Sequence, residues 1–411
     1  MKRVVVTGLG MINSVGQDKE EAFSAILNGE CGIKHIELFD AEKYSVKIAG
    51  EIVGFEPSKV MDAKEVKKAD RFIQLGLKAT KEAMDDANFT TEVDKERFGI
   101  SSASGIGGLP NIEKNSVICH TRGPRRVSPF FIPSSLVNML GGFISIAHGI
   151  KGPNLSCVTA CAAGTHAVAE AAKTIMLDGA DQMLVVGAES AICGAGIGGF
   201  AAMKALSTNN ENPKESSRPF DADRNGFVMG EGAAALVLEE YESAVARGAR
   251  IYGEVIGFGE SGDANHITTP VVDGPLRAMR AAVRMANKNS DSGEVKIDYI
   301  NAHGTSTPAN DKNETAAVKE LFGGAENCPP MSSIKGQIGH CLGAAGAIEA
   351  VVSLMAMRDG KLPPTINYTT QDENCNLDYV TDGVRDADVN VVMSNSFGFG
   401  GTNGVVIFKK I

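Results

Sequence analysis

Three side chains with nucleophilic or acid–base chemistry lie in turns rich in small residues, and the first of them is Cys161. It stands in the run Thr159-Ala160-Cys161-Ala162-Ala163-Gly164, after a short apolar stretch and before strong helix formers. This pattern predicts a strand-to-helix turn, where backbone N–H groups and the helix dipole favour a thiolate. The same N–H groups could hold an oxyanion. A lone cysteine in such a turn is more often a small core residue, so its role depends on the rest of the chain.

The other two side chains are His303 and His340. His303 follows a predicted strand, and ligands of open α/β sheets collect at the carboxyl ends of strands. His340 follows Lys335 in a Gly- and Ala-rich stretch, so the two could point into a shared pocket. The simpler alternatives are a histidine that bonds a turn and an exposed lysine beside a closely packed helix. Because the Cys and His spacings fit no zinc pattern, we expect no metal.

Glycine-rich segments near the two ends of the chain have different interpretations. Residues 396–404 lie between two apolar strands, and Phe399 on its glycine hinge could act as a gate. A hairpin loop with core aromatics is the simpler alternative. Near the N-terminus, residues 7–10 resemble half of a dinucleotide fingerprint. Asn13 occupies the position of the third glycine and no phosphate-loop lysine follows, which argues against nucleotide binding.

Composition excludes several classes of protein. The 411 residues are 43% hydrophobic, enough for two domains or one large pseudo-symmetric α/β unit. A formal net charge of -10 disfavours nucleic-acid binding. The eight cysteines form no CxxC pair, which favours reduced thiols in a cytoplasmic protein. No apolar run approaches the roughly 20 residues of a membrane span, and the N-terminus reads as a first strand instead of a signal peptide.

Strand-like runs alternate with helical patterns along the chain, which predicts an α/β fold with largely buried sheets. A soft boundary divides the sequence into an N-terminal half, residues 1–250, and a C-terminal half, residues 251–411. We expect strands at residues 3–7, 98–102, 154–158, 183–187, 251–257, 297–301, 389–394 and 404–408. We expect helices at residues 19–28, 64–88, 135–148, 162–177, 239–250, 274–286, 313–321 and 344–359.

Basic residues form clusters on this acidic chain. The first cluster has helical spacing, and two others follow: Lys64, Lys67, Lys68 and Arg71; Arg122, Arg125 and Arg126; and Lys204. Most such clusters are solvated surface. Against the net negative charge, they are nevertheless the best candidates for docking an acidic partner.

Taken together, these motifs resemble the β-ketoacyl–acyl carrier protein synthases of the thiolase superfamily, of the elongating type and nearest to synthase II. The resemblance covers essentially the whole chain and includes two further motifs, residues 218–221 and 226–232. All of these motifs in this order are highly specific. The resemblance implies a thiolase-like five-layered αβαβα fold of two pseudo-symmetric halves and a homodimer. It implies no cofactor, because acyl and malonyl groups arrive on the phosphopantetheine of acyl carrier protein.

The resemblance also implies a role for each catalytic residue. Cys161 would accept an acyl chain as a thioester, and malonyl-carrier protein would lose carbon dioxide to give the carbanion that attacks it. His303 and His340, as neutral imidazoles, would each donate an N–H to the enolate. Lys335 would orient the histidine region and pair with Glu314. The N–H groups of Cys161 and Phe399 would form the oxyanion hole, and Phe399 would also gate malonyl entry.

Binding residues are implied in the same way. Substrate contacts fall on Ile106, Phe200, Thr268, Thr305, Thr307 and Gly400, and carrier-protein docking on Lys64, Lys67, Lys68, Arg71 and Lys204. One departure stands beside His340, where Gly336 and Ile338 replace the Ser and Thr usual in the family. Both hydroxyls are lost, which changes the hydrogen bonding expected there.

Related reaction classes fit less well. A thiolase would carry a second cysteine in the last Gly-rich loop, which has none, and a priming synthase would carry Asn in place of His340. The sequence therefore predicts an acyltransferase that elongates β-ketoacyl chains by two carbons in type II fatty acid biosynthesis. A polyketide ketosynthase stays open as an alternative. A non-catalytic partner like a chain-length factor is the other, although such proteins lose the nucleophile that this chain keeps.

Overall fold

The computed structural model describes residues 1–89, 93–290 and 293–411, which form a mixed α/β fold. The strands are β1 Val4–Ile12, β2 Ile33–His35, β3 Ile48–Gly50, β4 Phe98–Ala103, β5 Asn154–Cys157, β6 Gln182–Glu189, β7 Gly232–Glu240, β8 Gly253–Gly262, β9 Tyr299–Asn301, β10 Met331–Ser332, β11 Lys361–Leu362, β12 Arg385–Asp386, β13 Val391–Gly398 and β14 Thr402–Lys409. The helices are α1 Lys19–Leu27, α2 Ala63–Val66, α3 Arg71–Ala87, α4 Leu109–Arg122, α5 Phe131–Ser135, α6 Met139–His148, α7 Ala163–Met176, α8 Gly194–Ala202, α9 Tyr241–Ala246, α10 Asp273–Lys288, α11 Pro308–Phe322, α12 Lys335–Ile338 and α13 Ala345–Asp359.

The largest sheet is a structural duplication. Its ten strands run in the order β10-β9-β13-β14-β8-β1-β7-β6-β4-β5, so each half has five strands in matching positions. In each half the first strand, β1 or β8, pairs antiparallel with β7 or β14. Next, β7 pairs antiparallel with β6, and β14 pairs antiparallel with β13. The outer pairs are parallel, namely β6–β4 and β4–β5 in one half and β13–β9 and β9–β10 in the other. The halves meet where β1 pairs antiparallel with β8, at Val5–Glu254 and Val6–Gly253.

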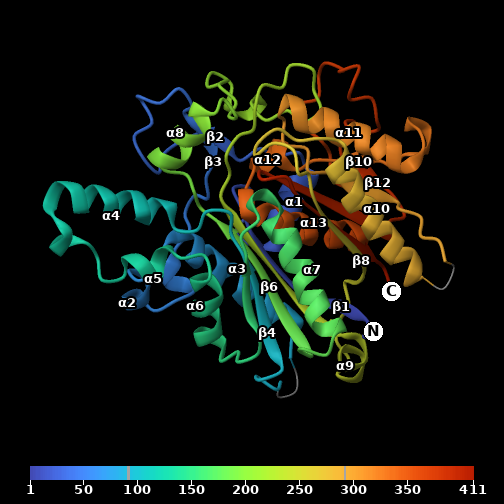
Figure 1. Ribbon diagram of the computed structural model, residues 1–411, viewed down its shortest axis with the longest axis horizontal. Coiled ribbons are helices and arrows are strands. Elements are labelled where there is room, and N and C mark those ends of the chain that lie inside the picture. Colours follow the sequence, from blue (N-terminus) through green and yellow to red (C-terminus); the bar gives the residue numbers. More distant parts are fainter. Residues whose placement is uncertain (90–92, 291–292) are drawn as a thin grey trace.

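Five layers follow from how the two faces of each half are covered. Leu236 and Leu238 of β7 point into a central hydrophobic cluster with α7 and α13, whereas Ala235 and Val237 face the cluster built on α3. A third cluster joins α10 to the outer face of β8, β13 and β14. Figure 1 shows α7 and α13 in the middle of the molecule, with α3 on one side and α10 on the other. This arrangement confirms the predicted thiolase-like fold class.

Most predicted elements are present with small changes in their bounds, and the differences have local causes. Strand β7 was not predicted, because its run Gly-Ala-Ala-Ala-Leu-Val-Leu has no alternation and a buried strand cannot be told from a helix by period alone. The predicted helix 239–250 is shorter, because β7 continues to Glu240. The predicted helix 64–88 is two helices, since Asp70 caps α3 by accepting the Phe72 N–H. The predicted helix 135–148 likewise begins later, at Met139.

Among the described residues, no helix combines the length and apolar character needed to cross a membrane. The eight cysteines all carry free thiols.

Candidate active site

Cys161 lies in a single 3₁₀ turn, residues 160–162, between β5 and α7, as the sequence predicts. Ala160, immediately before it, has φ +50°, a left-handed conformation that is costly for a residue with a Cβ. The backbone N–H of Phe399 donates to the thiol, and the charge of Lys335 also favours the thiolate. Burial outweighs both and raises the pKa of Cys161 to about 12. The resting group is therefore a thiol, although the turn supplies the interactions that favour a thiolate.

His303 and His340 converge on this thiol. One ring nitrogen of each histidine and the Cys161 sulfur all lie within 4.8 Å of one another. The two imidazole centroids are 5.4 Å apart and the rings are nearly perpendicular, at 84°. Burial lowers the pKa of both histidines well below the ordinary value, and the charge of Lys335 lowers it further. Both rings are therefore neutral, and each has one N–H to donate. The same positive charge disfavours a metal cation at this position.

Lys335 is buried and pairs with Glu349 of α13, and its ammonium also donates to the His303 carbonyl oxygen at 2.6 Å. The predicted pairing of Lys335 with Glu314 is thus wrong. Glu314 instead accepts the N–H groups of His303 and Gly304, at 2.9 and 2.8 Å. Glu349 was missed by sequence reasoning, although a single carboxylate in the apolar run 344–357 is a signal of a buried partner.

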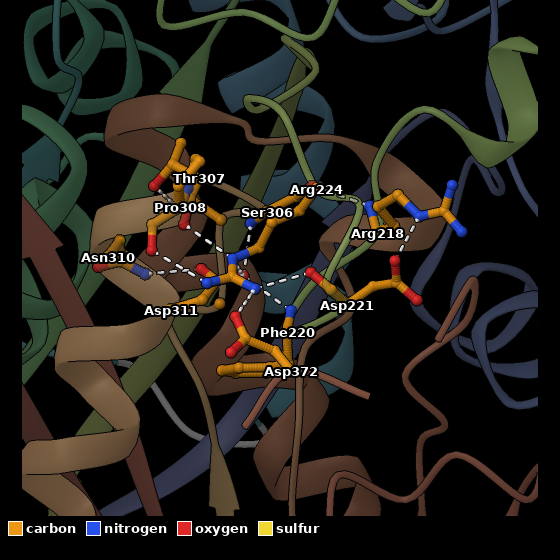
Figure 2. A network of polar contacts seen from close by, with 12 residues as sticks. Arg218, Phe220, Asp221, Arg224, Ser306, Thr307, Pro308, Asn310, Asp311 and Asp372 are labelled. Carbon is orange, nitrogen blue, oxygen red and sulfur yellow. Dashed lines mark hydrogen bonds and ion pairs between the residues drawn. The ribbon is translucent and has the colours of Figure 1, made fainter. Parts of the chain in front are cut away.

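The turn that follows His303 is held by a buried ionic network, shown in Figure 2. Ser306 has φ +68°, and its N–H donates to the Asp311 carboxylate at 3.1 Å. Arg224 covers the other side of the turn and donates to the carbonyls of Thr307 and Pro308, at 3.3 and 3.0 Å. It also pairs with Asp372 at 2.7 Å. The network therefore ties the motif at residues 218–221 and the segment that follows it to the histidine turn.

His340 is held by the second family motif, residues 226–232. Its N–H donates to the Val228 carbonyl at 2.7 Å, and its own carbonyl accepts the Gly230 N–H at 2.9 Å. A Cβ at Gly230 would lie 2.4 Å from the Ile338 carbonyl oxygen, so this position admits only glycine. Gly336 and Ile338, the two departures from the family pattern, are both accommodated by packing. A Cβ at Gly336 would lie 2.7 Å from the Ile366 side chain, and Ile338 belongs to the central hydrophobic cluster.

A cavity of about 360 Å³ opens onto the three reactive groups. Four of the six predicted substrate residues line this cavity, namely Phe200, Thr268, Thr305 and Thr307. Phe399, predicted as a catalytic residue, and Lys204, predicted as a docking residue, line it as well. Phe399 is 37% exposed at the tip of the β13–β14 hairpin, with its ring 6.3 Å from that of Phe200. Two predicted residues are not part of its lining. Ile106 packs in the neighbouring apolar cluster with Cys161, and Gly400 closes the hairpin, with its N–H donating to the Ile267 carbonyl.

Three of the predicted docking lysines, Lys64, Lys67 and Lys68, lie on and next to α2, whereas Lys204 follows α8 and lines the cavity. Lys64 and Lys67 are exposed, and Lys68 pairs with Glu65 at 2.5 Å. Arg71 differs from them, because its side chain is only 24% exposed and its guanidinium pairs with the fully buried Glu231 at 2.7 Å. The positive charge of Arg71 therefore neutralises a buried carboxylate of the same chain.

The Arg224 guanidinium also lies 3.8 Å from the fully buried Asp311 carboxylate. Replacing Arg224 by Met should lower the free energy of unfolding by about 3–5 kcal/mol, because Asp311 would stay buried without this guanidinium. Denaturant unfolding monitored by circular dichroism measures this. Arg280→Met, which removes an exposed ion pair with Glu320, is the matched control and should cost about 1 kcal/mol or less. Equal losses in the two variants would contradict the structural role of the network.

Comparison with known proteins extends these observations. The family model described as "Beta-ketoacyl synthase, N-terminal domain" matches residues 1–244, and "Beta-ketoacyl synthase, C-terminal domain" matches residues 252–369. The chain is 46% identical to 3-oxoacyl-[acyl-carrier-protein] synthase 2 of Coxiella burnetii over 411 residues, covering 100% of this chain and 99% of the relative. It is also 46% identical to the protein of the same name from Vibrio cholerae over 415 residues, again covering 100% and 99%.

Solved structures agree with the sequence matches. A β-ketoacyl synthase from Burkholderia phymatum superimposes with a TM-score of 0.92 at 34% identity, with 100% of both chains covered. A ketosynthase in complex with its type II PKS acyl-carrier protein superimposes with a TM-score of 0.89 at 31% identity, covering 100% of this chain and 99% of that one. On these matches over both halves, and with Cys161, His303 and His340 lining one cavity, the chain belongs to the β-ketoacyl synthase family.

Proposed function

We propose that this enzyme condenses an acyl chain with malonyl-acyl carrier protein, with loss of carbon dioxide, to give β-ketoacyl-acyl carrier protein two carbons longer in type II fatty acid biosynthesis. The observation that carries the proposal is the convergence of Cys161, His303 and His340 within 4.8 Å. The names of the relatives at 46% identity agree with it. A polyketide role is less favoured, because the ketosynthases solved with a chain length factor or a PKS carrier protein are 35% and 31% identical, below the 46% of the synthase 2 relatives.

The first step is transfer of the acyl group to Cys161. The sulfur attacks the carbonyl carbon of the carrier thioester, a new C–S bond forms and the carrier C–S bond breaks. The proton of the Cys161 thiol passes to the departing pantetheine sulfur. Burial keeps Cys161 protonated before the attack. Because the oxyanion on the carbonyl develops in a buried site, it needs hydrogen-bond donors, and we assign this role to the N–H groups of Cys161 and Phe399. Phe399 also gates the cavity for the malonyl group.

The second step is decarboxylation and condensation. The carbon–carbon bond to the malonyl carboxylate breaks, and its electron pair moves onto the thioester as an enolate. His303 and His340 each donate one N–H to the enolate oxygen, which suits rings kept neutral by burial. Carbon dioxide leaves, and the carbanion carbon attacks the carbonyl carbon of the Cys161 thioester. A carbon–carbon bond forms, the C–S bond to Cys161 breaks, and the sulfur leaves as a thiolate that takes up a proton from water. Losing one such donor typically lowers the rate by about two to three decades.

Substrate entry uses the outer part of the cavity. The hydroxyl groups of Thr268, Thr305 and Thr307 are proposed to contact the pantetheine arm, and Ile106 and Phe200 the acyl chain. Lys204 at the mouth, with Lys64, Lys67 and Lys68 on the surface, would meet the acidic carrier protein. We also propose that the N-terminal half ends at residue 250 and the C-terminal half begins at residue 251. The proposed site of action is the cytoplasm. The eight free thiols agree with a reducing compartment.

A homodimer is proposed from the edge of the sheet. β5 is the outermost strand of its half, and Leu155 on it and Val158 just after it are 57% and 55% exposed. Val117, Ile132 and Leu136 add exposed apolar side chains from α4, α5 and the turn after α5. An uncovered apolar sheet edge is an aggregation hazard that natural proteins cover. A second copy paired through β5 would cover it.

The acyl-enzyme is the direct test of the function. Incubation with acyl-carrier protein should add one acyl mass to Cys161, and malonyl-carrier protein should then discharge it as a product two carbons longer. Intact-protein mass spectrometry with peptide mapping measures both steps. Cys161→Ala should remove the adduct and the product. An adduct on another cysteine, or full elongation by Cys161→Ala, would contradict the assignment.

The pH dependence of malonyl decarboxylation tests the role of the Lys335 charge. Because that charge lowers the histidine pKa values, the wild-type rate should stay flat through pH 6.5 and fall only at lower pH, as the imidazoles take up protons. The double variant Lys335→Met, Glu349→Gln removes the charge without leaving a lone buried carboxylate. Its acidic limb should shift to higher pH. Lys173→Met removes a lysine on α7 outside the cavity and should keep the wild-type pH profile. An acidic limb that does not shift in the double variant would argue against an effect of the Lys335 charge on the histidines.

Replacing Leu155 by Asp should convert the proposed dimer to a monomer, because each copy would then bury a carboxylate in the apolar contact between the paired edges. Size-exclusion chromatography with light scattering reports the mass. Val384→Asp changes an equally apolar exposed residue away from this edge and should stay dimeric. A dimeric Leu155→Asp would move the interface elsewhere.

A further inference from the structure

A third histidine, His166, lies beside the nucleophile turn but outside the cavity lining. It is in the first turns of α7 and is 9% exposed. Its Nδ1 lies 2.6 Å from the Thr159 hydroxyl, and its Nε2 lies 3.2 Å from the Asn403 carbonyl oxygen. A carbonyl only accepts hydrogen bonds, so Nε2 carries the proton and Nδ1 accepts from the hydroxyl. One neutral tautomer therefore satisfies both contacts.

These two bonds join the nucleophile turn to the hairpin that carries Phe399. Thr159 is two residues before Cys161, and Asn403 lies at the start of β14, just after the hairpin tip. Two parallel contacts support the junction: Thr402 donates to the Thr159 carbonyl at 3.0 Å, and Thr165 bonds Ser396 at 2.8 Å. The distance between the two proposed oxyanion donors therefore depends on this junction.

The duplicated half supplies an internal comparison. α7 and α13 both begin after a 3₁₀ turn whose first residues, Ala160 and Leu342, have φ +50° and +45°. The matching runs Ala162-Ala163-Gly164 and Ala344-Ala345-Gly346 place Ile348 at the position of His166.

The two residues have the same packing role. A Cβ at Gly404, in β14, would lie 3.0 Å from the His166 ring, and a Cβ at Gly232, in the equivalent β7, would lie 3.0 Å from Ile348. In the C-terminal half, whose turn at residues 342–344 carries no reactive cysteine, the apolar side chain of Ile348 therefore fills the position that His166 fills in the N-terminal half. Packing alone does not account for a histidine with two hydrogen bonds in the half whose turn carries Cys161.

We propose that His166 is a positioning residue for acyl transfer, which holds the Cys161 turn and the Phe399 hairpin at the separation that the oxyanion requires. The inference rests on the proposed function and deepens it by separating the two half-reactions. His303 and His340 are held by other contacts, those of Glu314, Lys335 and Val228. The decarboxylation step should therefore be insensitive to His166.

The test measures both steps in variants of the full-length protein. His166→Ile installs the residue of the other half and should slow acylation of Cys161 by about 10- to 100-fold, the range expected when donors are misplaced. Decarboxylation of malonyl-carrier protein, assayed without an acyl donor, should change less than about twofold, an expectation that follows from the separate support of the histidines. Thr159→Val removes one of the two bonds with little change of shape and should slow acylation in the same selective way. His166→Gln, which keeps a donor for the Asn403 carbonyl, should recover part of the rate.

Ile348→Val is the matched control. It disturbs the equivalent position and should lower thermal stability without slowing acylation. Wild-type acylation rates in both His166→Ile and Thr159→Val would overturn the inference, and so would equal loss of acylation and decarboxylation. Either result would leave the proposed function intact, because the wild-type enzyme in the same assay reports it: failure of the wild type to acylate Cys161 would overturn the function itself.

Discussion

The backbone contact between α7 and α13 is the constraint on which the site depends. A Cβ on Gly164 would lie 2.5 Å from the Ala347 nitrogen, and a Cβ on Gly346 would lie 2.5 Å from the Thr165 nitrogen. Any side chain at either position would separate the helices. Their close crossing brings the turns at residues 160–162 and 342–344 into contact. Cys161, in the turn before α7, and Glu349 of α13, which pairs with Lys335, are thereby held close to this helix crossing at the centre of five layers.

One buried charge then acts on all three reactive groups. The Lys335 ammonium lowers the pKa of the Cys161 thiol and of both histidines. Burial opposes this effect at the thiol and reinforces it at the imidazoles, because desolvation always disfavours the charged form. The resting site therefore holds a thiol and two neutral rings beside a paired ammonium. Negative charge develops only when a thioester is attacked or a malonyl group loses carbon dioxide, and donors are already in place for it.

The predictability of this structure from its sequence depends on whether a feature is local. Cys161 and His303 were predicted because each follows a strand in a small-residue turn, and such turns are determined by nearby residues. β7 was missed because its alanine-rich run carries no period. The partner of Lys335 was assigned to Glu314 instead of Glu349, since the choice between two buried carboxylates depends on how α13 packs. Arg71 shows the same limit, because its pairing with Glu231 is decided by tertiary contacts.

The duplication also bears on the oxyanion hole. Gly343 is the counterpart of Cys161 in the second turn, and its N–H donates to the buried carboxyl group of Glu189 at 3.0 Å. That group also accepts the N–H groups of Gly105 and Ile106, which together oppose the rise in its pKa caused by burial. The equivalent donor in the second half is thus already occupied by an acidic side chain of the protein. In the first half Cys161 lines the cavity, and its N–H is one of the two donors proposed for the oxyanion. Under that proposal, the same backbone geometry holds a structural carboxyl group in one half and a transient oxyanion in the other.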